Sequence, residues 1–462
     1  MPTNEIQNIL ALKKEDDIIQ SFKRKIPTPP KWSTLELQYY AKHHDIMNEA
    51  TYQDVSVTAD GKVVRVPLTL EQEATNRLTG LTFGLAVTRS YDAQNETQQR
   101  AQAIIERIYK KNRINALNLK RGKFYFAACE MASLWYLSPS KPHYDYGEKC
   151  EYKLRHRTYT PMEGDSIYPL FNEDQDLIAL SFEYNYYNGL ETRRFFDTFT
   201  DNVHIRWEFK GDTADKKWVR LFEKKHEVGK IPGVYAWAKE PCWRESSRLR
   251  AEQERAYSDN GNYIRDNSTP VLAIFADGKI SFGDEDNRRF RKIVKYPANG
   301  RMEYVTWQQS PEAVKMQLEG LRREFYTSLQ IPDISFENMK SLPISGEAMK
   351  RVFIDAQLRV KQESGALHAF LDREANVIKA FASLMFPELE RAFNELTIEN
   401  TIHPYTIDDE KDRIDRYTSA TGGKAIMSQR EAIERSGLSR NPSQTLEEIR
   451  ADEAHDVFGG YE

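Results

Sequence analysis

One place in the chain invites a search for a phosphate-binding loop, the pair Gly423-Lys424. The Walker A pattern has its first glycine five residues before the second and a serine or threonine directly after the lysine. Those two positions hold Thr418 and Ala425 here. The spacing therefore excludes this kind of nucleotide-binding loop, and with it the simplest route to ATP hydrolysis.

The sequence also gives no support for a metal site or for acid–base catalysis. The nine histidines include no HExxH pair. Four of them are scattered through sequence that favours strands, where packing is commoner than metal binding: His143, His156, His204 and His226. Adjacent carboxylates at Asp284-Glu285-Asp286 mostly point apart, and Asp408-Asp409-Glu410 lacks partners at a defined spacing. We expect no catalytic residue, no cofactor and no metal.

The cysteines and the composition are those of an ordinary soluble protein. Cys129, Cys150 and Cys242 are odd in number, far apart and without CxxC spacing, so we interpret them as reduced thiols. Hydrophobic residues make up 40% of the chain and charged residues 29%. No apolar run reaches the roughly 18 residues of a membrane span, and the first residues lack a signal-peptide layout. We expect a soluble protein made in the cytoplasm.

The strongest pattern lies in the elements rather than in any reactive group. Ser310-Pro311-Glu312 is a helix start, and apolar residues recur every three or four positions from Val314 to Leu329. The pattern stops at Pro332, and residues 333–344 are predicted to form a loop. A second helical pattern begins at Ser345-Gly346-Glu347 and continues to Pro387, with a possible kink at Ser364-Gly365. Two helices joined by a loop without catalytic groups indicate a mechanical part.

The first half of the chain mixes helices and strands. Residues 16–25 and the proline-rich residues 26–30 predict a terminal arm and a linker. Helices are predicted over 69–80 and 97–111. Alternating residues predict strands over 123–136, 177–187, 192–199, 203–209 and 217–222. Asn188-Gly189 predicts a two-residue hairpin turn between the second and third of these strands.

The predicted helix 240–267 is polar on all sides. Its charged residues leave few apolar positions, which is unlike a helix in a monomer core. Arg248 with Glu252, and Arg250 with Glu254, have the spacing of ion pairs within a helix. Such a helix either lies on the surface in solvent or packs against a neighbouring subunit.

Six stretches between residues 225 and 455 follow one another in a recognisable order. They are Val228–Pro232, a polar helix with Ala256-Tyr257-Ser258-Asp259, the strand Pro270–Phe275, the helix Ser310–Leu329, Ser345–Lys350, and Gly422–Ser428 followed by Glu431-Ala432. No single stretch is diagnostic. Their order and spacing resemble the siphophage-type portal proteins of tailed double-stranded DNA bacteriophages, over roughly half of the chain.

The resemblance implies an α+β portal fold with a β-rich wing, a two-helix stem, a small α/β clip, a long kinked tunnel helix and an α-helical crown. The implied divisions are an N-terminal arm (1–30), the wing (31–239), stem helix 1 (240–269), the clip (270–308), stem helix 2 (309–330), the tunnel loop (331–345), the long helix (346–386), and the crown with the C-terminal tail (387–462).

The resemblance also implies where the working residues lie. Residues facing DNA in the tunnel loop would be Glu337, Asn338, Met339, Lys340 and Ser341. Residues of the stem channel would be Arg244, Arg248, Arg255, Lys315 and Arg322. Residues of the clip that contact the packaging motor or the adaptor would be Lys279, Asp284, Glu285, Arg288 and Arg289.

The implied function is a ring, usually a dodecamer, at one capsid vertex, through which DNA is packaged and ejected. Implied partners are the terminase large subunit, a head-completion or adaptor protein, the major capsid and scaffolding proteins, and DNA that passes without sequence recognition. The implied location is the virion, after assembly in the host cytoplasm and without a membrane. A net charge of −4 fits a bore that DNA must slide through, because many cationic contacts would act as a brake.

Two other functions stay open from the sequence. One is a nucleic-acid enzyme of the packaging machine, a terminase or nuclease. The other is a capsid or adaptor structural protein that does not handle DNA.

Overall fold

The computed structural model describes residues 3–24, 27–52, 63–211, 217–267, 271–275, 277, 281–282, 294–295, 301–305, 311–333, 353–405, 410–422, 425–436 and 444–451. Two compact units form: Met1–Asp333 with Leu358–Pro404, and Ile334–Gln357 with Tyr405–Glu462. Helices and strands are mixed, as the α+β prediction requires. Within the described ranges, no helix combines the length and the apolar character needed to cross a bilayer.

The first unit contains a five-stranded antiparallel sheet. Its strands lie in chain order: β4 (Ser166–Phe171), β5 (Leu177–Tyr187), β6 (Thr192–Phe199), β7 (Val203–Lys210) and β8 (Lys217–Lys225). Neighbouring residues of a strand point to opposite faces, so β5 turns Leu180 and Phe182 to one side and Ala179 to the other. The sequence predicted four of these strands correctly.

A second, three-stranded sheet covers one face of the first. It has the order β3-β2-β9, formed by β2 (Glu130–His143), β3 (Cys150–Tyr159) and β9 (Gly233–Trp237). Leu134 and Tyr159 from this sheet join Phe182 and Phe199 from the larger one in a buried cluster. Tyr159 and Phe182 stack with ring centroids 4.0 Å apart, so an aromatic layer joins the sheets.

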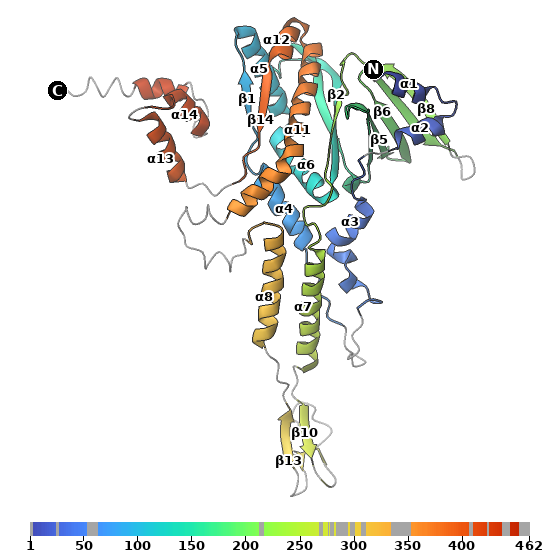
Figure 1. Cartoon of the computed structure of the whole chain (residues 1–462), viewed down its shortest axis with the longest axis vertical. Helices are drawn as coiled ribbons and strands as arrows, with labels where there is room; N and C mark the ends of the chain where they lie inside the picture. The colour runs from blue at the N-terminus through green and yellow to red at the C-terminus, as the bar shows by residue number, and fades with distance from the viewer. Residues whose placement is uncertain are drawn as a thin grey trace, which may run out of the picture. The chain divides into compact units, whose positions relative to one another are not determined.

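The N-terminal arm covers the other face of the five-stranded sheet (Figure 1). It forms α1 (Thr3–Leu10) and α2 (Glu15–Phe22). Ile18, Ile19 and Phe22 are buried against the sheet residues Phe196 and Trp207. Within the N-terminal arm that was expected over residues 1–30, α1 and α2 thus pack onto the sheet.

Two details of the predicted strands were wrong. Residues 123–128 belong to a helix, α6 (Ile114–Ala128), and the strand begins only at Glu130. A short apolar run looks alike in a buried helix and a buried strand, and here Cys129, at a φ of 58°, separates the two. The β5–β6 hairpin forms, but its loop contains residues 188–191, with the Asn188 amide donating to the Glu191 carbonyl (3.2 Å).

Helices pack beside the sheets. They are α4 (Leu70–Phe83), α5 (Glu96–Lys111), α6, the long α11 (Ile354–Met385) and the short α12 (Glu390–Glu395). β1 (Thr88–Asp92) pairs with β14 (Thr397–Thr401), which follows α12. The crown was expected to begin at residue 387, yet residues 387–404 belong to the first unit because β14 is tied to β1.

An antiparallel helix pair continues from this unit. α7 (Ser247–Asn267) leads to the strands β10 (Val271–Phe275) and β13 (Arg301–Val305), and α8 (Pro311–Ser328) leads back (Figure 1). β10 and β13 pair antiparallel, with Val271 opposite Val305, and the two-residue strands β11 (Ser281–Phe282) and β12 (Val294–Lys295) also pair. A two-helix stem with a small α/β clip was expected here; the described elements of the clip are all strands, and stem helix 1 begins seven residues later than the predicted residue 240.

In the second unit the described elements are helices. They are α13 (Glu410–Thr421), α14 (Gln429–Ser436) and a helical stretch over 444–451. The amides of Ile426 and Met427 both donate to the carbonyl of Ala420 (3.0 and 3.2 Å), which reverses the chain between α13 and α14.

Candidate functional site

The stem helix α7 buries a polar stripe. Arg250, Glu254, Ser258 and Asn262 are spaced four residues apart, so they lie on one face of the helix. Their exposed fractions are 5%, 1%, 0% and 5%. The prediction that this helix has no place in a monomer core is therefore wrong, because one polar face is buried within the same chain.

An extended segment of the first unit covers this stripe. The amides of Val64, Val66 and Leu68 donate to Asn262 Oδ1 (2.7 Å), Ser258 Oγ (3.0 Å) and Glu254 Oε1 (2.7 Å). Two residues of extended chain advance about 6.7 Å and four residues of helix about 6 Å. This match lets every second amide meet the next side chain of the stripe. We call these three bonds the α7 ladder.

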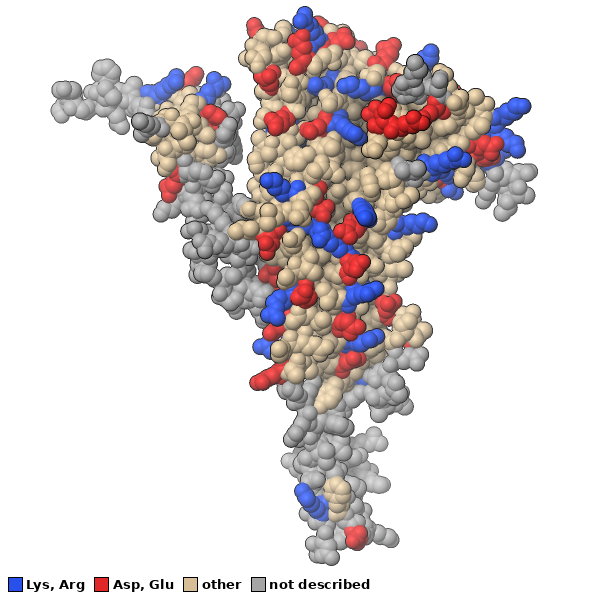
Figure 2. All heavy atoms as spheres, in the orientation of Figure 1, with Lys and Arg blue, Asp and Glu red and all other residues tan. Residues whose placement is uncertain are grey.

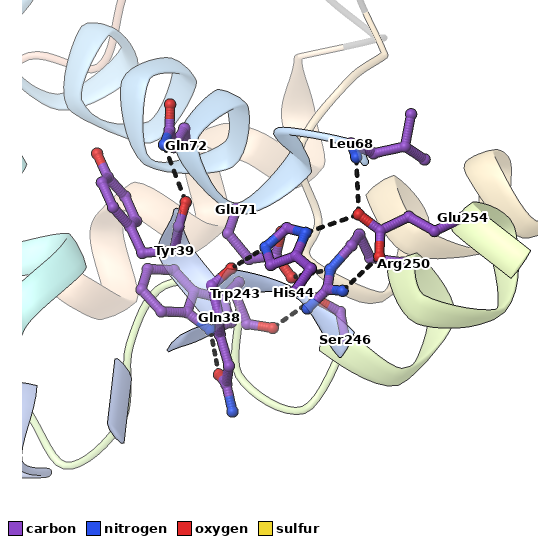
Figure 3. Close-up of polar contacts among 10 residues, drawn as sticks. All are labelled: Gln38, Tyr39, His44, Leu68, Glu71, Gln72, Trp243, Ser246, Arg250 and Glu254. Carbon is purple, nitrogen blue, oxygen red and sulfur yellow. Dashed lines mark hydrogen bonds and ion pairs between the residues drawn. The ribbon is translucent and has the colours of Figure 1, made fainter. Parts of the chain in front are cut away.

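A buried charge cluster fixes the start of α7 (Figure 3). Arg250 donates through Nε to Glu71 Oε1 (2.9 Å) and through Nη1 to Glu254 Oε2 (2.7 Å). His44 lies 2.6 Å through Nδ1 from Glu254 Oε1 and 2.9 Å through Nε2 from the Gln38 carbonyl. The cluster thus brings together the Arg250 guanidinium, the carboxyl groups of Glu71 and Glu254, and the His44 ring.

The Glu71 carboxyl in this cluster is under opposing influences. Burial raises its pKa, and the guanidinium of Arg250 acts against that rise. Since Glu71 belongs to α4 and Arg250 to α7, this ion pair joins the stem to the helices beside the sheets.

A second polar cluster lies at the end of α8. Arg322 Nε donates to Asp333 Oδ2 (3.0 Å), and Arg77 Nη1 donates to the Pro332 carbonyl (2.8 Å). The Tyr326 hydroxyl donates to Glu73, and the Arg77 guanidinium lies over the Tyr326 ring at 4.4 Å. The chain is thus held by two arginines directly before residues 334–352.

The long helix α11 has its own buried ion pair. Arg121 of α6 contacts Glu374 of α11 through two hydrogen bonds (2.6 and 3.0 Å), and Trp135 Nε1 donates to the same carboxylate (2.9 Å). Arg121 and Glu374 are each 1% exposed. These contacts fix α11 to α6 and to β2.

The predicted stem residues have different surroundings. Arg248, Arg255 and Lys315 are exposed on α7 and α8. Arg244, in contrast, precedes α7, has a φ of 47° and pairs with Glu240 (3.2 Å). Arg322 is engaged with Asp333. Arg255 and Lys315 also have acidic neighbours on their own helices, Glu252 (3.9 Å) and Glu319 (3.7 Å), but these pairs are exposed.

The other predicted site residues lie outside the described residues. In the tunnel loop they are Glu337, Asn338, Met339, Lys340 and Ser341, and in the clip they are Lys279, Asp284, Glu285, Arg288 and Arg289. Their assignment stays a prediction.

Two histidines and the three cysteines are packed against neighbouring side chains or buried in the fold. His156 packs edge-on against Trp135 and His204 stacks on Phe199 (centroids 4.1 Å apart). The three cysteines are buried and unpaired, and burial raises the pKa of Cys242 to about 12. Among the residues that the structure describes, no group of three His, Cys, Asp or Glu side chains is arranged to hold a metal ion.

The sequence analysis missed His44, Glu71 and the extended segment 63–68. The spacing of Arg250 and Glu254 did predict one ion pair, which is confirmed. His44 is 210 positions from Glu254, and no local pattern links the two.

Together, the packed sheets, the antiparallel helix pair with its β strands and the long helix define an α+β protein. The chain belongs to the phage portal protein family described as SPP1 Gp6-like, whose model matches residues 13–457. It is thus a structural protein of the virion that serves as portal and connector, and this membership does not favour a terminase or nuclease. The predicted family is confirmed.

Two solved structures resemble the fold loosely. The neck of an empty gene transfer agent particle, computed with C6 symmetry, matches at a TM-score of 0.42 and 10% identity over 80% of this chain and 90% of that chain. The virion of a native gene transfer agent particle matches at 0.42 and 10%, over 90% of this chain and 96% of that one. No curated protein matches the sequence.

Proposed function

We propose that copies of this chain close into a cyclic ring, a dodecamer as is usual in the family, whose bore passes double-stranded DNA during packaging and ejection. The observation that supports this most is the antiparallel pair α7 and α8, fixed at its base by buried charge clusters. In this proposal the wing faces outward and the helix pair surrounds the bore. Each interface is heterologous, because one face of a subunit meets a different face of the next.

The tip formed by β10 and β13 would meet the terminase large subunit during packaging and the adaptor protein afterwards. The second unit, with α13 and α14, would form the crown. Capsid and scaffolding proteins would contact the ring from outside. The location would be the portal vertex of the virion, after assembly in the host cytoplasm.

Residues 337–341 would reach the DNA as a tunnel loop. The support is indirect: Asp333, directly before them, is held by Arg77 and Arg322. A lysine in such a loop makes contacts with phosphate that carry no sequence information. Lys340→Ala combined with Asn338→Ala should reduce DNA packaging and leave ring assembly intact. Unchanged packaging would show that these side chains do not grip DNA.

The chain should have no activity of its own on nucleic acid. Purified protein incubated with magnesium, ATP and plasmid should neither hydrolyse the nucleotide nor cleave the DNA. Either activity would contradict the structural role and favour an enzyme of the packaging machine.

A further inference from the structure

The stem has a second surface that its buried contacts do not use. On α7 the exposed residues Glu252, Arg255 and Asp259 follow one another at helical spacing, and their charges alternate in sign. On α8 the exposed residues Lys315, Glu319 and Arg323 do the same. Figure 2 shows acidic and basic side chains alternating where these helices lie in Figure 1.

These charged side chains contribute little to the stability of a single subunit. The side chains of Arg255 and Glu252 are 63% and 62% exposed and only 3.9 Å apart at their closest atoms. Those of Lys315 and Glu319 are 75% and 67% exposed, 3.7 Å apart. Asp259 accepts a hydrogen bond from the Tyr52 hydroxyl (2.5 Å), which leaves further acceptor capacity on the carboxylate. Exposed pairs of this kind contribute little to the stability of one subunit.

One contact between α7 and α8 shows which residues of the two helices lie at the same level along the stem. Gln253 Nε2 of α7 lies 3.4 Å from the Leu318 carbonyl of α8, so these two positions lie at about the same level along the antiparallel pair. With stems that run along the ring axis, rotation about that axis keeps this level, so Leu318 of a neighbouring copy lies at the same height as residue 253. Glu252 would then lie level with Glu319, and Asp259 level with Glu312.

The direction in which helix side chains lean keeps these like charges from meeting each other. Side chains on a helix lean toward its N-terminus, so those of α7 and those of an antiparallel α8 lean toward each other. Each residue of α7 therefore meets a residue of α8 about one turn farther from the β tip. This shift brings together only opposite charges: Glu252 with Arg323, Arg255 with Glu319, and Asp259 with Lys315.

We infer that these three pairs form an ion-pair ladder between α7 of one copy and α8 of the next. The occupant of the exposed α7 face is thus a second copy of this chain, and charge complementarity selects it. Ion pairs at such a surface fix the register and the partner more than they add affinity. The inference rests on the proposed ring, and it specifies how neighbouring stems align.

Charge reversal with rescue tests the ladder. Arg255→Glu should weaken each interface about fivefold, the upper end for an exposed pair, and the loss multiplies around the ring. Arg255→Glu combined with Glu319→Arg should restore the ring population. The matched control combines Arg255→Glu with Glu312→Arg, which makes the same charge changes about two turns away on α8 and should restore nothing.

Mass photometry at several protein concentrations reports the fraction of complete rings, and circular dichroism checks that each variant folds. Rings that resist Arg255→Glu, or a rescue no better than that of the control, would overturn the ladder and leave the proposed function intact. A wild-type protein that forms no ring at all would contradict the proposed function itself. The difference between wild type and Arg255→Glu should also shrink at 1 M salt, where screening acts over about 3 Å.

Discussion

Buried charges in this chain have their counter-charges on distant segments. Arg121 and Glu374 come from α6 and α11, and Arg250 and Glu71 from α7 and α4. Removing one member of such a pair leaves the other charge buried without compensation, which costs far more than the pair itself contributes. At the scale of single residues, these pairs therefore decide how the helices are joined.

Replacing Glu374 tests the first pair. Glu374→Gln should lower the free energy of unfolding by about 3 kcal/mol, because the Arg121 guanidinium loses the carboxylate that it contacts and stays buried. Chemical denaturation measures the change. The control is Glu395→Gln, which removes the exposed pair with Arg391 and should leave stability near that of wild type. Equal effects of the two variants would contradict this account.

Asp165 gives a test by pH. Burial raises its pKa to about 6, against about 3.9 in an unfolded chain. Because the folded pKa is the higher one, the protonated carboxyl stabilises the fold below about pH 4, and this contribution is lost as the pH rises through about 6. The ionised form is thus the unfavourable one at neutral pH.

Asp165→Asn cannot ionise and keeps an oxygen acceptor for the Thr160 amide (3.3 Å in wild type). Thermal melts should show the variant about 1 to 2 kcal/mol more stable than wild type at pH 8 and similar at pH 4. Asp174→Asn, in an exposed turn, should show no such difference. A gain for Asp165→Asn that is equal at both pH values would argue against the titration.

At the scale of elements, the stem helix α7 depends on side chains in place of a partner strand. The amides of Val64, Val66 and Leu68 would form sheet bonds in most extended segments, and here they meet Asn262, Ser258 and Glu254. Unpaired amides at such a half-buried position are costly. The polar character of α7 is therefore a requirement of its packing.

Ser258→Ala removes the acceptor of the Val66 amide at the middle of the α7 ladder. Hydrogen exchange of peptides covering residues 63–69 should become about tenfold faster, as expected for the loss of one hydrogen bond. Arg248→Ala, on the exposed side of the same helix, should leave this exchange unchanged. Unaltered exchange in Ser258→Ala would show that the ladder does not hold the segment.

The sequence predicted those elements whose information is local. Alternating residues gave β5 and β6 with the correct bounds, and Pro311 marked the start of α8. The partner of α7 could not be found in this way, because Val66 is 192 positions from Ser258 and its backbone amide leaves no trace in the sequence. For this reason the sequence left only solvent or a neighbouring subunit as surroundings of α7.

Arg322, a predicted site residue, also has a partner that the local sequence pattern could not reveal. It lies on the helix that the sequence predicted from residue 310, but the sequence does not reveal that Asp333 approaches it after Gln330, which has a φ of 56°. Arg255 and Lys315 have only exposed acidic neighbours on their own helices, and their assignment to the channel stays a prediction.

At the scale of the whole molecule, family membership and the anchored stem lead to one central claim: many copies enclose a bore that admits a DNA duplex. The buried clusters at the base of the stem, one at the start of α7 and one at the end of α8, fix both helices to the rest of the first unit. The exposed charge stripes on α7 and α8 are then available to neighbouring copies.

Class averages of the purified wild-type protein by electron microscopy, viewed along the symmetry axis, test this claim most directly. The account predicts a closed ring with rotational symmetry and an open centre, built from stems that stand side by side around the hole. Particles that are single subunits or compact clusters without a central opening, at concentrations where the protein is fully folded, would contradict it.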